Sequence, residues 1–529
     1  MSPYKMPAGT PTNKVQASPL FPQLDKWKFE IDKLGSHRAD VVSSIINGFD
    51  MCRGPGGPPT QKTNYKSALD NFSVIDKMIG ELVSNGWAEG PFDQLPFENY
   101  YLNALAAVPK RDSTDLRLIV DCRRSNVNSK IPDQPFKFKS VEDAVHRLSP
   151  GAFMAKVDLT AAYMHVPLRP EDYRFVCFEW NKKFYYYTRL PFGVKSAPFI
   201  FADLSDLVTN MAERRGIKVI NYLDDFLIIH KRKATLKRQL RVFKNLLKSL
   251  GLGINEKKCT EPAKVCEFLG VLIDSRNGTL SLSEQRLGEV RHALNRHVHS
   301  KAIKLRDLQH LIGVLNWVAR VKPACRPFIR RMTNLLRGRP IVGHHFIRLN
   351  AEFRLDLKWW QEQLGNWTGR RIYISKYEKA ARFCTDASGV GIGGFYSGES
   401  FQAPIPAEYT ESSINVTESL AVLRACQLWG PSWKGRKVIG FCDNTATVHV
   451  TNKGSGLSEE MMHICRQIYT FQARYDFHLR LVHLPGAANY IADALSRFRA
   501  VTAQDVTDYN AAVNEWSLAD EMGLGWNKF

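Results

Sequence analysis

The chain has 529 residues, too many for one hydrophobic core, so we expect two to four domains. Lysine and arginine exceed aspartate and glutamate by 73 − 52 = 21, which favours a polyanionic partner, most commonly nucleic acid. An anionic membrane surface is the alternative, but no apolar stretch approaches the roughly 18 to 20 residues that cross a bilayer, and the first residues lack the apolar core of a signal peptide.

The ten cysteines show no Cys-x-x-Cys pair and no zinc-finger spacing. We therefore expect reduced, mostly buried thiols in an intracellular protein of the cytoplasm or nucleus, with no membrane partner.

Composition and periodicity divide the chain into regions of different character. Residues 1–60 are rich in proline, glycine, threonine and lysine, which indicates a flexible arm, although LDKWKFEIDKL within it is compatible with a helix. Strand and helix patterns alternate from about 61 to 275, with a hairpin predicted around an Asn-Lys turn in RFVCFEWNKKFYYYTRLPFG. The stretch 234–251 places its leucines and Phe243 on one helical face, and the lysines and arginines opposite indicate a solvated face. Residues 284–337 are basic and have helical patterns throughout, and the tryptophans of the next helix indicate packing more than base stacking.

Two adjacent carboxylates interrupt an apolar run at 219–230, VINYLDDFLIIH. The apolar flanks predict two short strands, and Asp224 and Asp225 predict the turn between them. Alone, this motif leaves a structural turn and a metal site equally open. A third acid, Asp158, ends the strand predicted in GAFMAKVD. Three clustered carboxylates repel one another unless a cation joins them, and this number of oxygen ligands suits Mg²⁺, two of which can flank an in-line phosphoryl displacement.

Five motifs occur in the order found in reverse transcriptases: KVDLTAAY, LPFGVKSAPFIFADL, YLDD, LGLGINEKKC and FLGVLID. Residues 75–275 therefore resemble the palm and fingers of that family. The resemblance implies that Asp158 and Asp224 bind two Mg²⁺ ions, with Mn²⁺ as an alternative, and that Asp225 completes the acidic site. It also implies an RNA template, a DNA primer and deoxynucleoside triphosphates as substrates.

The same resemblance assigns roles to residues around the acids. Tyr163 matches the aromatic steric gate that excludes a ribose 2′-hydroxyl, a core aromatic being the alternative. Gly193 would let the backbone approach the nucleotide and template, because glycine has no Cβ. Phe192 stands where retroviral enzymes often carry glutamine, which makes a hydrogen bond at that position doubtful.

Basic residues would hold the phosphates of the incoming nucleotide. Lys110 and Arg117, in VPKRDSTDLRLIVDCRRSN, match the pair that grips the triphosphate, although a solvated hairpin is the alternative. Lys258 matches the lysine proposed to protonate the leaving pyrophosphate. Its neighbour Lys257 remains open for the same role.

A second set of acids lies in a strand–strand–helix–strand–helix pattern from about 380 to 497. Two of its members end predicted strands, Asp386 and Asp443, and two lie on predicted helices, Glu418 in a first turn and Asp493. Glu418 alone would also suit a helix cap. The set and its order resemble ribonuclease H, which implies two Mg²⁺ ions and hydrolysis of the RNA strand of an RNA–DNA hybrid. His483 precedes Asp493 as the mobile-loop histidine does in active members, a loop histidine without a role being the alternative.

The expected fold is therefore an α/β (α+β) multidomain chain, a right-hand polymerase followed by a ribonuclease H-like α/β domain. The basic helical region is placed like a thumb, which predicts salt-dependent binding to duplex phosphates. The expected boundaries are 1–60 flexible N-terminal arm, 61–280 fingers and palm, 281–345 helical thumb, 346–379 short connection, 380–500 ribonuclease H-like domain and 501–529 C-terminal tail.

Three stretches favour one kind of element: WAEGPFDQLPF, LIGVLNWVARVKPACRPFIRRM and HLPGAANYIADALSR look most like DIRS-type retrotransposons, with gypsy-like elements as the near alternative. Gypsy-like polyproteins usually carry an aspartic protease and an integrase, and neither signature stands in this chain. The rival functions are a domesticated, non-enzymatic nucleic-acid binder and a polymerase with inactive ribonuclease H. An RNA-templated RNA polymerase shares the palm but not Tyr163 or the second set of acids. The sequence leaves the oligomeric state open.

Overall fold

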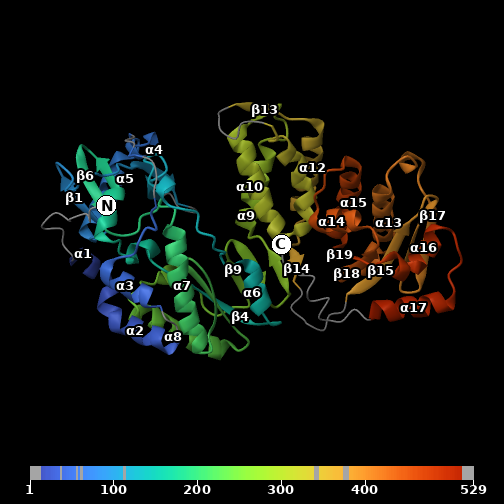
Figure 1. The fold of residues 1–529 in the computed structure, drawn as a ribbon, viewed down its shortest axis with the longest axis horizontal. Coiled ribbons are helices and arrows are strands. Elements are labelled where there is room, and N and C mark those ends of the chain that lie inside the picture. The colour runs from blue at the N-terminus through green and yellow to red at the C-terminus, as the bar shows by residue number, and fades with distance from the viewer. Residues whose placement is uncertain are drawn as a thin grey trace. The chain divides into compact units, whose positions relative to one another are not determined.

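The computed structural model describes residues 13–35, 38–54, 58–59, 63–110, 115–338, 345–372 and 380–514. The chain divides into two compact units, which are 1–147 with 152–266, and 148–151 with 267–529 (Figure 1). Parts of five expected regions lie outside the described residues: 1–12, 36–37, 55–57 and 60 of the arm, 61–62 and 111–114 of the fingers and palm, 339–344 of the thumb, 373–379 of the connection and 515–529 of the tail. No described helix has both the length and the apolar character that crossing a membrane requires.

The N-terminal arm is not wholly flexible, which corrects the expectation from its composition. It contains the short segments α1 (Asn13–Gln16), η1 (Phe21–Gln23), α2 (Leu24–Lys33) and α3 (Ala39–Asn47). Trp27 on α2 is fully buried, and its indole Nε1 donates to the Leu250 carbonyl oxygen at 3.0 Å. The arm is ordered by contacts with residues far away in the sequence, which proline and glycine content cannot reveal.

Three antiparallel strands carry the first group of acids. They are hydrogen-bonded in the order β4 (Phe153–Asp158), β8 (Asp225–His230) and β7 (Lys218–Tyr222). The sheet is covered because α7 (Ala197–Arg214) packs on β7, and α8 (Lys233–Ser249) packs on β4 and β8. The apolar face predicted for α8 is confirmed, since its leucines and Phe243 are buried.

Two smaller sheets complete the first unit. One has three strands in the order β1 (Ala88–Phe92), β6 (Lys183–Tyr187) and β5 (Cys177–Trp180). The other is a hairpin of β2 (Ala104–Pro109) and β3 (Leu116–Asp121). The predicted turn between β5 and β6 is confirmed, because Asn181 and Lys182 have φ of +49° and +59°, as a two-residue hairpin turn requires. The remaining helical segments are α4 (Lys66–Leu69), α5 (Phe72–Ser84), η2 (Asn128–Lys130), α6 (Val141–Arg147), η3 (Ala162–His165), η4 (Pro170–Phe175) and η5 (Glu256–Lys258).

The second unit begins with a helical region that is not purely helical. Its helices are α9 (Glu284–Asn295), α10 (Leu305–Val321), η6 (Pro323–Ile329), α11 (Arg330–Asn334) and α12 (Ala351–Gly365). Contrary to the helical pattern read over 284–337, β12 (Ala302–Lys304) pairs with β13 (Phe346–Arg348), because their central isoleucines are buried together. Small strands also occur before and after the helices: β9 (Val265–Phe268), β10 (Val271–Asp274), β11 (Thr279–Ser281) and β14 (Arg370–Arg371).

The two tryptophans of α12 pack inside the second unit, as predicted. Trp360 is fully buried, and Trp359 stacks on Phe328 with ring centroids 3.5 Å apart.

Of the ten cysteines, all are free thiols and eight are buried, which agrees with their predicted state.

A five-stranded mixed sheet carries the second group of acids. Its order is β17 (Glu399–Pro404), β16 (Gly391–Tyr396), β15 (Ala381–Ala387), β18 (Lys437–Cys442) and β19 (His478–His483). The first three strands are antiparallel, and β18 is parallel to both β15 and β19. Successive side chains such as Phe383 and Cys384 enter different apolar clusters, so both faces of the sheet are covered.

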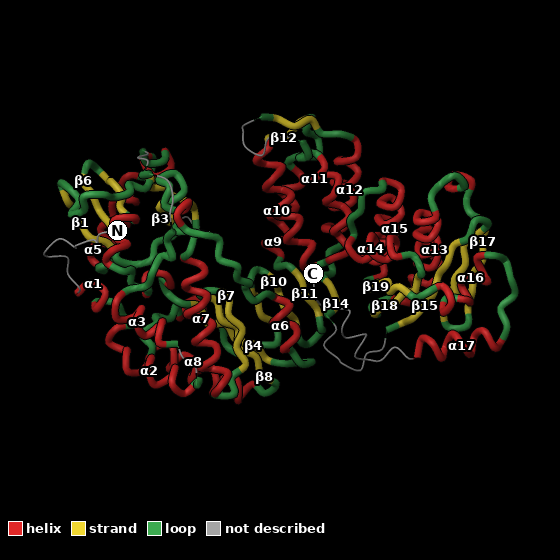
Figure 2. Tube along the Cα trace, viewed as in Figure 1, coloured by secondary structure: helices red, strands yellow, loops and turns green. Residues whose placement is uncertain are grey.

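Helices cover both faces of this sheet (Figure 2). One cluster draws on α13 (Ile414–Trp429) and α15 (Glu459–Tyr475), and the other on α16 (Tyr490–Ser496) and α17 (Ala503–Asn514). The other segments are α14 (Thr445–Lys453), η7 (Ala407–Tyr409), η8 (Gly430–Trp433) and η9 (Gly486–Ala488).

Candidate active sites

The first group of acids meets at the ends of two paired strands. Asp158, the last residue of β4, lies opposite Asp225, the first residue of β8. The chain reverses at Leu223 and Asp224, one residue earlier than predicted, so Asp225 belongs to the strand and only Asp224 to the turn. Leu223 has a φ of +55°, a conformation that costs a side chain other than glycine about 1 kcal/mol and is often found at functional sites.

Burial and the charges of neighbouring carboxylates favour the protonated state of Asp158 and Asp224. Asp158 is 4% exposed, and its Oδ1 accepts no hydrogen bond from any residue in the described part of the chain. Burial raises the pKa of Asp158 to about 6, and the nearby Asp225 and Asp224 add to the rise while Lys258 opposes it. Burial and the charge of Asp225 also raise the pKa of Asp224.

Two lysines lie against these acids. The Lys258 Nζ is 3.5 Å from Asp158 Oδ1, and the Lys156 Nζ is 3.3 Å from Asp225 Oδ1. Lys156 was not singled out from the sequence, although its position two residues before Asp158 on the same strand places both side chains on one face. A buried carboxylate oxygen without a hydrogen bond, beside two further carboxylates, is a donor set that fits a hard divalent cation.

Tyr163 lies beside the acids on η3. Its ring is buried and its centroid is 4.9 Å from that of Phe192. Burial and then the charge of Asp224 raise its pKa, so the hydroxyl stays protonated. The structure therefore brings the predicted gate residue, Phe192 and Asp224 together.

The structure explains the glycine at position 193 by a contact within the protein, and not by the expected approach of nucleotide and template. A Cβ on this residue would stand 1.8 Å from the Val120 carbonyl oxygen, so the close approach is to strand β3 of the same unit. The Val120 amide also donates to the Phe192 carbonyl oxygen at 3.1 Å, and the Asn128 side-chain amide donates to the Gly193 carbonyl oxygen at 2.9 Å. The loop that carries Phe192 is thus fastened to the strand that carries Arg117.

Arg117 and Lys110 lie on the β2–β3 hairpin. The Arg117 guanidinium lies over the Phe192 ring at 5.1 Å from its centroid, and its charge opposes the rise in the pKa of Asp224. Lys110 is exposed and pairs with Asp115 at 3.7 Å. The structure therefore brings Arg117 to the acids and places Lys110 at the end of the hairpin, next to residues 111–114, which lie outside the described chain.

The second group of acids surrounds the parallel part of the five-stranded sheet. Asp386 lies near the end of β15, Asp443 directly follows β18, Glu418 lies in the second turn of α13 and Asp493 lies on α16. Burial raises the pKa of Glu418 to about 8, and the charges of Asp386 and Asp443 add to the rise. Burial likewise raises the pKa of Asp386 to about 6, with Asp443 and Asp493 contributing. The four predicted acids therefore act on one another electrostatically.

Three further residues bind these carboxylates and were not predicted. The Ser496 hydroxyl donates to Asp386 Oδ2 at 2.7 Å, the Cys442 thiol is 3.6 Å from Glu418 Oε2, and Arg497 pairs with Asp493 at 2.8 Å. Arg497 follows Asp493 by four residues, the helical spacing that could have indicated it, whereas Ser496 contacts an acid 110 residues away in the sequence.

Ligand atoms are closest together in this second site. Among the described residues, one group of three or more His, Cys, Asp or Glu side chains has its ligand atoms within 4.8 Å of one another, and it consists of Glu418, Cys442 and Asp443. Carboxylate oxygens fit Mg²⁺, whereas a thiol is a soft ligand, so Asp386 is the better third donor. His483 is the exposed last residue of β19 rather than a loop residue, and it lies opposite Cys442 in the strand register.

A family model described as "Reverse transcriptase (RNA-dependent DNA polymerase)" matches residues 108–273, the part of the chain that holds Asp158, Tyr163, Gly193 and Asp224. Residues 108–273 are a reverse transcriptase domain.

The curated relatives that this chain resembles include polyproteins of mobile elements and of a virus. The retrovirus-related Pol polyprotein from transposon opus of Drosophila melanogaster is 22% identical over 468 residues, covering 86% of this chain and 44% of the relative. The Tf2-3 transposon polyprotein of Schizosaccharomyces pombe is 22% identical, covering 87% and 34%, and the putative enzymatic polyprotein of Cassava vein mosaic virus is 22% identical, covering 80% and 64%. The chain spans less than half the length of the first two of these curated relatives.

Solved structures share the fold of this chain. A foamy viral protease–reverse transcriptase in complex with double-stranded DNA matches with a TM-score of 0.50 at 16% identity, covering 92% of this chain and 84% of that one. The foamy viral protease–reverse transcriptase in complex with an RNA/DNA hybrid matches with a TM-score of 0.50 at 15% identity, covering 92% and 64%. The expected α/β multidomain polymerase fold is confirmed by these likenesses.

Proposed function

We propose that this chain is an RNA-directed DNA polymerase that copies retroelement RNA into DNA, and that its C-terminal α/β region is a ribonuclease H. The pairing of Asp158 with Asp225 at the ends of β4 and β8, beside Asp224 and inside a reverse transcriptase domain, is the observation that carries the polymerase half. Its substrates would be an RNA template, a DNA primer and deoxynucleoside triphosphates. Its product, an RNA–DNA hybrid, would be the substrate of the ribonuclease H.

In the polymerase site, Asp158 and Asp224 would hold two Mg²⁺ ions. When bound, these ions lower the pKa of the attacking hydroxyl and neutralise charge on the phosphates. Lys258, whose ammonium lies 3.5 Å from Asp158, would give a proton to the leaving pyrophosphate. Arg117 would hold the triphosphate through its planar guanidinium, with Lys110 as a second positive charge.

In the ribonuclease H site, the four acids Asp386, Glu418, Asp443 and Asp493 would hold two Mg²⁺ ions, which supply an activated water and stabilise the leaving oxygen. Ser496 fixes the orientation of Asp386 through its hydroxyl, and the Ala387 amide donates to Glu418 Oε1 at 3.2 Å. His483, exposed at the end of β19, would move protons or help release product. Contacts to ribose 2′-hydroxyls would select the RNA strand.

Two assays on the full-length protein separate the two activities. With Mg²⁺, wild type should extend a DNA primer on an RNA template and cleave the RNA of a preformed hybrid. Asp224→Asn should lose extension and keep cleavage, whereas Asp443→Asn should lose cleavage and keep extension. Asp25→Asn, at a fully exposed carboxylate on α2, should keep both activities.

The rival functions give different results in the same assays. Extension without cleavage by wild type would favour a polymerase with an inactive ribonuclease H. Tight binding of the hybrid by wild type with neither extension nor cleavage would favour the domesticated binder and overturn the enzymatic function.

We assign the parent element to the DIRS type, on the three stretches WAEGPFDQLPF, LIGVLNWVARVKPACRPFIRRM and HLPGAANYIADALSR. DIRS-type elements use a tyrosine recombinase. A tyrosine recombinase reading frame beside this one in the genome would support the assignment, and an integrase reading frame there would contradict it.

A further inference from the structure

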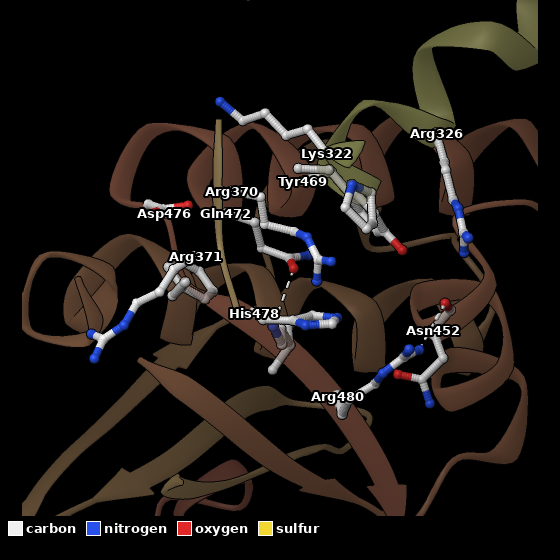
Figure 3. A pocket seen from close by; sticks show the side chains of 14 residues that line it. Lys322, Arg326, Arg370, Arg371, Asn452, Tyr469, Gln472, Asp476, His478 and Arg480 are labelled. Carbon is white, nitrogen blue, oxygen red and sulfur yellow. Dashed lines mark hydrogen bonds between the residues drawn. The ribbon is translucent and has the colours of Figure 1, made fainter. Parts of the chain in front are cut away.

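A small basic cavity lies inside the second unit, and its lining includes none of Asp386, Glu418, Asp443 and Asp493. It has a volume of about 40 Å³ and lies between η6 and β14 on one side and α14, α15 and β19 on the other (Figure 3). This volume is the space open to the centre of a water-sized sphere, of which one water needs roughly 10–15 Å³. The cavity therefore suits a small polyatomic ion and not a nucleotide. Five of its lining residues carry a positive charge and one carries a negative charge: Lys322, Arg326, Arg370, Arg371 and Arg480, and Asp476.

Most of the charged side chains that line the cavity are arginines. Figure 3 shows Arg326 and Arg480 on the same side of the cavity near Asn452, whereas the carboxylate of Asp476 and the ammonium of Lys322 lie away from them. The one lining carboxylate therefore does not lie between the two guanidinium groups. Asp476 is the one acidic residue that lines the cavity, and neither Arg326 nor Arg480 forms an ion pair with it in the described part of the chain.

These two arginines make few contacts with the described residues. Arg326 has neither a hydrogen bond nor an ion pair there, although it is half-buried. Arg480 makes one long contact, 3.5 Å from its Nη1 to the Asn452 carbonyl oxygen, and its buried Nε has no hydrogen-bond partner. The Asn452 side chain donates to the Leu481 carbonyl oxygen at 2.7 Å and accepts from the Leu481 amide at 2.8 Å, and it makes no hydrogen bond with either arginine among the described residues.

Two neighbouring guanidinium groups in a partly closed space destabilise each other. Burial and the charge of Arg326 both lower the pKa of Arg480. Charges removed from water are normally paired, and an anion is the missing partner. Gln472 provides a further donor, because its Oε1 accepts from the Leu479 amide at 3.1 Å while its Nε2 has no partner among the described residues.

We propose that this cavity binds a phosphate-class oxyanion, held by the guanidinium groups of Arg326 and Arg480 and by the Gln472 amide. Guanidinium groups bind tetrahedral oxyanions through two parallel hydrogen bonds, which a small cavity with two arginines can provide. The anion can be free phosphate or one phosphodiester group of a nucleic acid. Arg326 also lines an open groove of about 400 Å³ together with Arg320, Arg330 and Lys453, and this groove would bring a nucleic-acid backbone to the cavity. The site does not depend on either proposed enzymatic activity.

Calorimetric titration of the full-length protein with sodium phosphate tests the site, at constant ionic strength maintained with sodium chloride and without nucleic acid. Wild type should bind phosphate at a site that Arg326→Gln and Arg480→Gln each weaken about tenfold, the effect of losing one charge-assisted hydrogen bond. Arg424→Gln, at an exposed arginine on α13, should bind like wild type. If Arg480→Gln does not fold, Arg326→Gln decides alone, because this arginine makes no hydrogen bond or ion pair with the described residues.

The outcomes are distinct. Wild-type heats equal to those of a chloride blank would overturn the site, and so would phosphate binding by Arg326→Gln that matches wild type in affinity and stoichiometry. Repeating the titration with a short RNA–DNA hybrid bound identifies the source of the anion. Competition between hybrid and phosphate at this site would assign it to a nucleic-acid phosphodiester, and independent binding would assign it to free phosphate.

Discussion

Gly193 lies so close to Val120 that no other residue fits at its position. A Cβ on Gly193 would stand 1.8 Å from the Val120 carbonyl oxygen, and the φ of Gly193 is +122°, which residues with a side chain rarely adopt. Because β3 also carries Arg117, this contact holds the Phe192 loop and a phosphate-binding candidate in one arrangement.

Gly193→Ala should therefore lower both stability and primer extension. The control is Gly216→Ala, because Gly216 has a φ of +72° with no atom within 4 Å of an added Cβ. Its cost should be about 1 kcal/mol, from backbone conformation alone. Gly193→Ala should cost more than that in urea unfolding and reduce extension at least about tenfold, since the loop must move away from β3. Equal unfolding free energies for the two variants would contradict the close contact as the reason for glycine.

Lys258 and Lys257 are adjacent, but only Lys258 has its ammonium beside Asp158. Lys258→Met should slow nucleotide addition by about 10²-fold, the usual effect of removing a general acid. Because the Lys258 charge lowers the pKa of Asp158, its removal should raise that pKa and move the acidic limb of the pH–rate profile to higher pH. Lys257→Met is the matched control and should change neither the rate nor the profile. The same loss of rate in both variants would remove the specific role of Lys258.

Tyr163 should select deoxynucleotides through the bulk of its ring. Tyr163→Ala should lower the preference for deoxynucleotides over ribonucleotides by at least about tenfold, because the space beside Phe192 would then accept a 2′-hydroxyl. Tyr163→Phe keeps the ring and should keep the preference. Single-nucleotide extension with each nucleotide type measures both values of kcat/KM. An unchanged ratio in Tyr163→Ala would leave Tyr163 as a core aromatic residue only.

Local patterns in the sequence were sufficient to predict where the acids lie. Asp158 and Asp386 follow apolar alternation that defines a strand, and Glu418 lies in a helical pattern, so each carboxylate could be assigned to an element. The turn in VINYLDDFLIIH was misplaced by one residue, because the position of reversal depends on the register between β7 and β8, with Tyr222 opposite Asp225, which the apolar pattern alone does not fix.

Contacts between distant residues could not be predicted from pattern. Trp27 is buried against Leu250, and Gly193 meets Val120, although neither pair is close in sequence. The Cys442 thiol beside Glu418 is another such case, because it depends on how α13 packs near the end of β18. Such residues are identified only once the packing of the elements is known.

Glu418 should make the stability of the metal-free protein dependent on pH. Burial and two neighbouring acids raise its pKa from 4.5 to about 8 in the folded state. Between these values the folded state binds more protons than the unfolded state, so the free energy of unfolding should fall as pH rises from about 4.5 to 8. Glu418→Gln has no proton to lose and should show a smaller decrease, whereas Glu399→Gln, at an exposed site on β17, should follow wild type. Urea unfolding between pH 4.5 and 8 measures the decrease in the free energy of unfolding. Mg²⁺ added near pH 8 should restore stability to wild type more than to Glu418→Gln, because the cation compensates the ionised carboxylates. Parallel pH curves for wild type and Glu418→Gln would show that Glu418 is already ionised in the folded protein.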